Sequence, residues 1–481
     1  MNKSARIEPL SRGAGSGIRA VHLDMKGVPP KFSRLLRLLE IFRHAGFNAV
    51  LVEWEDAFPW TVDTAFRSQT CLSECQVRQF HTHAHELGLD IIPLVQCLGH
   101  METPLRSGKY AYLREKTDQT DVLNVLATGA SQFVTSLIED VLALTPDCRC
   151  FFLGGDEAWS FGTHPDTQAY IRRYGKATLY RRHVEPLCDL LQARGIRPIL
   201  WHDMMIDWAE PDLQSLGTKA DLCIWAYYAA ADIPWQLAGS TDSAPADLPL
   251  LAGGGAIVSS ATFRRFLDNG IRLWGAGAYK CSRPGANSDV PDFASRSRNF
   301  QDWLEYDRTF NLQGLVATGW SRNSTDGVQY IPIDAALDTL MACGLTWSPP
   351  NCTPDRELAL KALKKIGELH TYEVAAGHMM RLTKIRDNGW SVVIRLRELL
   401  AVAKVEPERC IRRLAQLHLT WLNDHCVAGD ALRVEGAATF SLLIDQIWYN
   451  AYFNERLEAL RAEYNDLRRQ VLELPPPPGA Q

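Results

Sequence analysis

Short, nearly continuous apolar runs recur along the first two-thirds of this 481-residue chain. Uninterrupted apolar segments of this length are typical of strands buried on both faces of a parallel sheet. The runs occupy residues 18–24, 48–53, 91–96, 150–154, 197–202, 222–225, 271–275 and 314–320. The pattern therefore predicts eight buried strands in sequence.

Segments with helical spacing of apolar residues lie between these runs. Examples are residues 31–45, 73–87, 130–144 and 178–194. Several are followed by a glycine just before the next run, at Gly46, Gly88, Gly195 and Gly270. A glycine in this place is a typical helix C-cap. Eight strand-then-helix units predict an α/β fold, a closed (β/α)8 TIM barrel. An open doubly wound sheet is the alternative, although no Gly-x-Gly-x-x-Gly turn follows the first strand.

The pattern changes near residues 347–353, where the sequence SPPNCTP interrupts it. Residues 355–472 are poor in strand signals and show helical periodicity. We expect an N-terminal tail (1–17), a barrel (18–350), an all-helical domain (351–474) and a disordered proline-rich tail (475–481). The sequence leaves open whether the helical domain covers the barrel floor or builds a homodimer.

Composition excludes several classes of partner. The chain is 46% hydrophobic and 22% charged with a net charge of −5, and no basic stripe indicates nucleic acid. The chain contains no run of about 18 apolar residues, which a membrane-spanning helix would need. Residues 1–18 also lack the apolar stretch of a signal peptide. The 12 cysteines are scattered without a doubled Cys-x-x-Cys pattern. They indicate free thiols in a reducing compartment, so we expect a cytoplasmic protein.

The most informative local feature is the sequence Gly154-Gly155-Asp156-Glu157 at the end of the fourth run. Barrel enzymes keep their chemistry at the carboxyl ends of strands, and glycine allows close backbone approach. Adjacent residues on a regular strand point to opposite faces. Asp156 and Glu157 can therefore share a site only if the chain leaves strand geometry there, and we expect that it does.

Polar and aromatic residues also end the other runs and converge on the same mouth. The further candidates are Asp24, Lys26, Glu53, His100, Trp201, Asp203, Trp225, Tyr227, Trp274, Trp320 and Arg322. Carboxylates accept hydrogen bonds from sugar hydroxyls and indole rings stack on the C–H faces of a sugar, so the set suits a carbohydrate. Individually, the acids can instead cap helices or neutralise lysines, and the tryptophans can simply fill the barrel.

Metal chemistry has little support in the sequence. Only His22, His100 and His202 lie near strand ends, where a metal-dependent hydrolase needs its ligands. His81, His83 and His85 fall on the second predicted helix, outside the barrel, where a solvated or packing role is favoured. We expect no metal and no cofactor.

These motifs resemble glycoside hydrolase family 20, the β-N-acetylhexosaminidases, and within it the hexosaminidase D group. The resemblance runs from about residue 22 to residue 322. It rests on VHLDMKGVPP (21–30), VEWEDAFPW (52–60), PLVQCLGHME (93–102), LGGDE (153–157), WHDM (201–204) and TGWSR (318–322).

The resemblance implies substrate-assisted, retaining hydrolysis of a terminal 2-acetamido sugar, in which the substrate amide is the nucleophile. By similarity, Glu157 would be the general acid and Asp156 would orient the acetamide N–H. Tyr227 would hold the acetamide oxygen. Trp201, Trp225 and Trp320 would wall the pocket for the acetyl methyl group.

Two departures from the wider family stand out. The extra α+β domain that many members carry before the barrel is not expected here, because only about 17 residues precede the first strand. Lys26 replaces an arginine that holds sugar hydroxyls, and a lysine is a point charge rather than a planar fork. The hexosaminidase D group implies β-linked GalNAc over GlcNAc. A non-catalytic sugar-binding barrel is the alternative function.

Overall fold

The computed structural model describes residues 17–229, 232, 248–253, 256–281, 289–322, 325–347, 355–406 and 411–475. The predicted N-terminal tail, apart from Gly17, and the proline-rich tail after Pro475 lie outside the described residues. Residues 348–354, where the barrel and the helical domain were expected to divide, also lie outside them. The boundaries of the four predicted segments therefore stay predictions.

Eight parallel strands of the described chain form a closed barrel in the order β1-β10-β9-β6-β5-β4-β3-β2. They are β1 (Ile18–Asp24), β2 (Ala49–Glu53), β3 (Asp90–Leu94), β4 (Cys150–Phe152), β5 (Arg197–Trp201), β6 (Asp221–Trp225), β9 (Leu273–Lys280) and β10 (Gly314–Gly319). Val21 of β1 pairs with Val50 of β2 on one side and with Ala317 of β10 on the other. Pairing of the first and last strands closes the sheet, so the TIM-barrel prediction is confirmed.

Helices surround the barrel. They are α1 (Phe32–Ala45), α2 (Glu74–Glu86), α3 (Glu102–Leu105), α4 (Ala130–Leu144), α5 (Pro165–Tyr174), α6 (Lys176–Gln192), α7 (Glu210–Gly217), α9 (Ser260–Asp268), α10 (Phe293–Phe310) and α11 (Leu337–Leu345). Short 3-10 turns are η1 (Glu55–Ala57), η2 (Thr64–Phe66), η3 (Gly108–Leu113), η4 (Asp203–Met205) and η6 (Ile333–Ala336). Ser73 closes a capping box with Gln76 at the start of α2, which satisfies orphan backbone donors. The four predicted cap glycines all have positive φ.

The seventh barrel strand differs from its prediction. It was expected to end at residue 275, but β9 continues to Lys280 through alternating glycine and alanine. Small residues are needed there, since a Cβ on Gly275 would lie 2.4 Å from the Trp303 ring of α10. Trp274 is therefore the second residue of its strand and not a strand-end residue. The two-stranded hairpin of β7 (Leu251–Gly253) and β8 (Ala256–Val258) was not predicted either.

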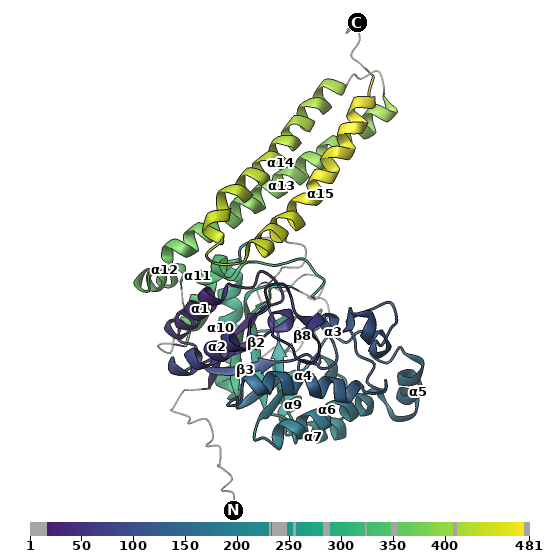
Figure 1. Ribbon diagram of the computed structural model, residues 1–481, viewed down its shortest axis with the longest axis vertical. Coiled ribbons are helices and arrows are strands. Elements are labelled where there is room, and N and C mark those ends of the chain that lie inside the picture. Colours follow the sequence, from purple (N-terminus) through teal and green to yellow (C-terminus); the bar gives the residue numbers. More distant parts are fainter. Residues whose placement is uncertain are drawn as a thin grey trace, which may run out of the picture.

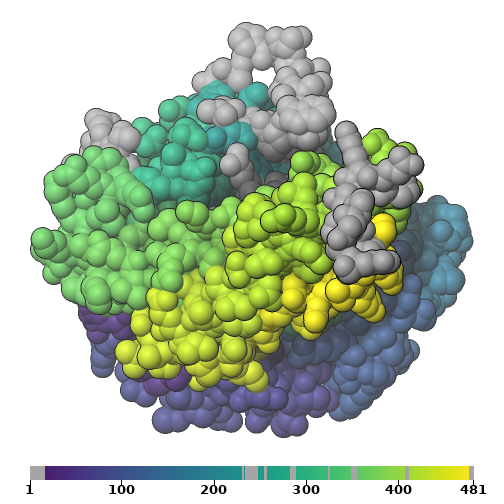
Figure 2. All heavy atoms as spheres, turned by 90° about the horizontal axis from the view of Figure 1, so that it is seen from above, coloured from purple at the N-terminus to yellow at the C-terminus, as the bar shows by residue number. Residues whose placement is uncertain are grey.

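The C-terminal region is helical, as expected. It contains α12 (Arg356–Lys365), α13 (Leu369–Val405), α14 (Arg412–Phe440) and α15 (Gln446–Glu473). The three long helices pack along one another and project from the barrel (Figure 1). Figure 2 looks down on the molecule from above, and in this view the helical region (green to yellow) lies in front of the barrel. In the described part of the chain, no helix combines the length and apolar character needed to cross a bilayer.

Candidate active site

The loop after β4 carries the two adjacent carboxylates. Gly154, Gly155 and Glu157 have φ values of +62°, +81° and +45°, so the chain has left strand geometry as expected. Both glycines are also needed for space. A Cβ on Gly154 would lie 1.8 Å from Gln96 Oε1, and one on Gly155 would lie 2.4 Å from Tyr180 Oη. The left-handed backbone and the close packing together fix the direction of Asp156 and Glu157.

Asp156 and Glu157 face one imidazole. His100 Nε2 lies 3.5 Å from Asp156 Oδ2 and 3.4 Å from Glu157 Oε2. Burial alone would lower the pKa of His100, but the two carboxylates outweigh it and raise that pKa well above its usual value. The Asp156 side chain is only 7% exposed, whereas that of Glu157 is 24% exposed. The two acids therefore occupy different environments within one site.

Asp203 supports the same loop from the end of β5. Its Oδ2 accepts a hydrogen bond of 2.9 Å from the backbone N–H of Glu157. Burial, and then the neighbouring charge of Asp156, raise the pKa of Asp203 to about 7. Asp156 Oδ1 is buried and has no hydrogen-bond partner among the described residues. This oxygen is available to a donor on a ligand.

A buried lysine occupies the end of β1. Lys26 Nζ lies 2.6 Å from Glu53 Oε2 and 3.3 Å from Asp24 Oδ1. Burial opposes the charge of Lys26, yet Asp24, Glu53 and Glu55 raise its pKa well above the usual value. Burial likewise opposes ionisation of Glu53, but Lys26 and His22 hold its pKa well below the usual range. This cluster is a fixed set of charges on the floor of the mouth.

Glu55 is a site carboxyl that was not among the candidates. It lies two residues after Glu53, has φ +47°, and accepts a hydrogen bond of 2.7 Å from Thr103 Oγ1. Burial is the main reason that its pKa rises to about 8. A cavity of about 30 Å³ beside Glu55 and His100 has room for about one water molecule. The sequence signal that could have identified Glu55 is its position just after the end of the second strand.

Four aromatic side chains form a wall beside the lysine. The Trp201 and Trp320 ring centroids are 6.1 Å apart, and Trp225 stacks on Tyr227 at 5.3 Å. Trp320 Nε1 donates a hydrogen bond of 2.9 Å to Tyr227 Oη. Lys26 Nζ lies 5.1 Å from the centre of the Trp320 ring. The structure thus joins the aromatic wall to the charged cluster.

Of the predicted site residues, Trp274 lies elsewhere and Arg322 lies at the rim of the mouth. Trp274 is buried low in the barrel and donates a 3.0 Å hydrogen bond to Asp221, the first residue of β6. It is therefore at the end opposite the carboxylates. Arg322 lies at the rim after β10, with its side chain 12% exposed and its Nη2 atom 3.6 Å from Glu455 of α15. The remaining predicted residues gather at the mouth.

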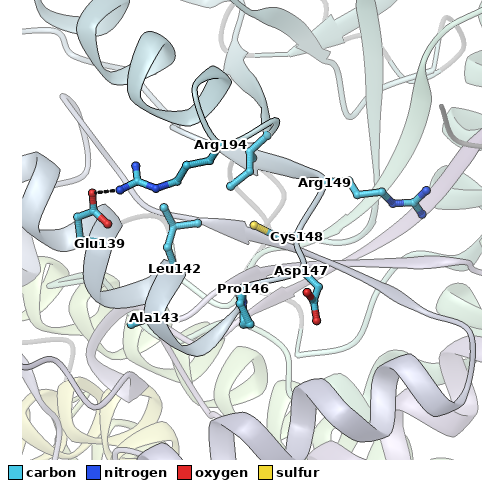
Figure 3. A pocket seen from close by; sticks show the side chains of 9 residues that line it. Glu139, Leu142, Ala143, Pro146, Asp147, Cys148, Arg149 and Arg194 are labelled. Carbon is cyan, nitrogen blue, oxygen red and sulfur yellow. Dashed lines mark hydrogen bonds and ion pairs between the residues drawn. The ribbon is translucent and has the colours of Figure 1, made fainter. Parts of the chain in front are cut away.

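A separate groove of about 700 Å³ opens at the other end of the barrel (Figure 3). It is lined by the end of α4 and by residues before β4 and β5, including Cys148, Arg149 and Arg194. Arg194 is paired with Glu139 across it. Within the described ranges, no group of three or more His, Cys, Asp or Glu side chains is arranged to hold a metal ion.

The sequence matches the family model for the glycosyl hydrolase family 20 catalytic domain over residues 55–238. It is also 29% identical to human Hexosaminidase D over 336 residues, covering 68% of this chain and 64% of the human protein. The bovine Hexosaminidase D is 28% identical over 337 residues, covering 68% of this chain and 90% of that protein. The chain is thus similar to glycosyl hydrolase family 20.

Two solved structures share the fold of this chain. The β-N-acetylhexosaminidase from Bacteroides fragilis aligns with a TM-score of 0.51 and 14% identity, covering 74% of this chain and 71% of that chain. The Flavobacterium johnsoniae chitobiase aligns with a TM-score of 0.54 and 13% identity, covering 94% of this chain and 74% of that chain. The family model match takes in the β4 loop with both carboxylates, His100 and the ends of β5 and β6.

Proposed function

We propose that this protein is a family 20 enzyme, an exo-acting, retaining β-N-acetylhexosaminidase that cleaves terminal β-linked 2-acetamido sugars by substrate-assisted catalysis. One observation carries the proposal. Two adjacent carboxylates of unequal exposure face the same imidazole in a mouth walled by Trp201, Trp320 and Tyr227. Relatives named Hexosaminidase D and the family match support the same class of reaction.

Each acid has the environment that its role needs. Glu157 is the more exposed and can reach a departing glycosidic oxygen and then an attacking water. Asp156 is nearly buried, and its free Oδ1 can accept the N–H of the acetamide. The acetamide oxygen then attacks the anomeric carbon and forms an oxazolinium intermediate. Asp156 stabilises the positive charge that develops, and the positioned amide provides a high effective concentration of nucleophile.

The remaining groups bind the sugar. Tyr227 Oη accepts a hydrogen bond from Trp320, which leaves its own proton for the acetamide oxygen. The rings of Trp201, Trp225 and Trp320 enclose the acetyl methyl group. Asp24, Lys26 and Glu53 bind ring hydroxyls, and we propose a preference for GalNAc over GlcNAc. Asp203 orients the loop that carries both acids through the backbone of Glu157.

The direct test is Glu157→Gln. We expect loss of turnover of 4-nitrophenyl 2-acetamido-2-deoxy-β-D-galactopyranoside, while binding of free GalNAc in a thermal-shift titration survives. Glu86→Gln on α2, where the side chain is 67% exposed, is the matched control and should keep full activity. Normal turnover by Glu157→Gln would refute the assignment. GalNAc binding by the wild type without turnover would support a sugar-binding barrel instead.

Two substrate comparisons test the mechanism and the specificity. The corresponding β-galactoside without the acetamide should be almost inert, because it lacks the nucleophile. Equal rates on both substrates would point to a nucleophile from the protein. Rates on matched GalNAc and GlcNAc glycosides test the proposed epimer preference. Activity should be insensitive to a chelator.

A further inference from the structure

The long helices α13, α14 and α15 form a helical bundle, and the end of this bundle nearest the barrel lies at the same end of the barrel as the proposed active site. Four loops that follow barrel strands contact it. The contacts are Lys31 N–H with Leu443 O (2.8 Å) after β1, Thr70 Oγ1 with Trp448 Nε1 (2.7 Å) after β2, Asp289 with Tyr452 Oη (2.7 Å) after β9, and Gln329 with Glu455 after β10. Every one of these loops leaves the carboxyl end of its strand, so α15 packs against the rim of the mouth rather than the barrel floor.

Glu455 of α15 connects two of these loops. Its Oε2 accepts a 2.9 Å hydrogen bond from the backbone N–H of Gln329, and its Oε1 accepts one of 3.2 Å from Gln329 Nε2. Gln329 Oε1 in turn accepts a 2.8 Å bond from the N–H of Val28, in the loop after β1 that carries Lys26. Val28 has φ +39°, a conformation that a β-branched residue adopts only when its surroundings hold it there.

Glu455 also faces the guanidinium of Arg322. The two charged groups are 3.6 Å apart, and both are mostly shielded from solvent, with 12% and 24% of the side chains exposed. Arg322 Nη1 donates a 3.0 Å bond to Thr325 O, and its buried Nε has no hydrogen-bond partner among the described residues. Within the described part of the chain, Arg322 thus keeps one donor without a partner.

The Arg322 loop lies against the loop of Lys26. A Cβ on Gly27 would be 3.0 Å from Arg322 Cγ and 2.8 Å from Ser321 O. Ser321 N–H donates a 2.7 Å hydrogen bond to Asp24 Oδ2. A shift of Arg322 would therefore displace the neighbouring charged cluster of Asp24, Lys26 and Glu53.

We propose that Glu455 is a positioning residue for sugar recognition, so that the helical region forms part of the substrate site. This role rests on the proposed hexosaminidase function. Glu455 holds Arg322 and the Lys26 loop in the positions where they contact hydroxyls of the terminal sugar. Glu455 does not touch the reacting atoms. Its loss weakens binding in the ground state and the transition state alike, which raises KM and leaves kcat nearly unchanged.

The test is Glu455→Gln, with Glu458→Gln as matched control. Glu458 is exposed on the same helix and carries the same substitution. With 4-nitrophenyl GalNAc we expect KM to rise about five- to tenfold for Glu455→Gln, with kcat within twofold of wild type. The inhibition constant of free GalNAc should rise by the same factor. Glu458→Gln should match wild type, and Glu455→Asp, which keeps the charge, should recover part of the loss.

A double-mutant cycle separates positioning from simple anchoring of the bundle. In an Arg322→Met background, Glu455→Gln should raise KM by a smaller factor than in the wild type, because the part of its effect that passes through Arg322 is already lost. Full multiplication of the two effects would overturn the inference, as would an unchanged KM for Glu455→Gln or an equal fall in kcat. If Glu455→Gln does not fold, Glu455→Asp is measured in the same cycle. Absence of wild-type turnover would overturn the proposed function itself, whereas normal turnover with an unchanged Glu455→Gln overturns this inference alone.

Discussion

Gly99 offers a test of how closely the catalytic loop is packed. It lies in the loop after β3, and a Cβ at this position would be 2.0 Å from the backbone oxygen of Asp156. Contacts between a Cβ and backbone below 3.0 Å are essentially never observed, so the loop would have to retreat by about 1 Å or more. A displacement of this size in a catalytic group costs about 100-fold in rate. That factor corresponds to about 2.7 kcal/mol in activation free energy.

The assay is kcat/KM for 4-nitrophenyl GalNAc, with melting temperature measured in parallel. We expect Gly99→Ala to lose about 100-fold in kcat/KM while still unfolding cooperatively. Gly108→Ala is the matched control, because a Cβ there would meet nothing within 4 Å. It should behave as wild type. A Gly99→Ala protein within threefold of wild type would refute the claim that the position of this loop limits catalysis.

Three further substitutions test single interactions. Asp156→Asn should lose roughly 2–4 kcal/mol of transition-state stabilisation, read from kcat, and a loss below tenfold would contradict its proposed role. The raised pKa of Asp203 adds stability that is complete below about pH 4 and is lost as pH rises to about 7. The difference in melting temperature between wild type and Asp203→Asn should therefore fall over that range, and a constant difference would argue against a shifted group. Asp289→Asn leaves Arg386 and Arg456 facing a neutral amide in a buried site, so we expect a loss of about 3–5 kcal/mol in a urea titration. A change below 1 kcal/mol would mean that this contact does not hold the bundle.

The barrel was predictable because its strands are apolar and its helices end in glycine. Strand β9 is the exception, and it shows where apolar runs fail to predict a strand. In β9, residues 275–278 are alternating glycine and alanine, which gives no apolar run, and strand structure there depends on Trp303 filling the space above the glycines. Because the predicted strand stopped at residue 275, Trp274 was expected at the mouth, whereas it lies near the opposite end.

The site was predictable where its residues follow strands, and not where they come from another part of the chain. Asp156, Glu157, His100 and the aromatic wall lie at strand ends, so a barrel brings them together. Glu455 lies in the middle of a long helix and carries no local sign of its contact with Arg322. Only packing of the bundle on the barrel creates that pair, and no periodicity in the sequence encodes it.

The contacts of α15 also imply an order of assembly. Pro30, after the first strand, pairs with Ile444, while Gln329, after the last strand, binds Glu455. These two anchoring points become neighbours only when β1 and β10 pair and the sheet closes. The complete docking surface for the bundle forms only with that event, because these two contact points come from opposite ends of the barrel sequence. Docking of the last helix is therefore a late folding event, and its kinetics report when the barrel has closed.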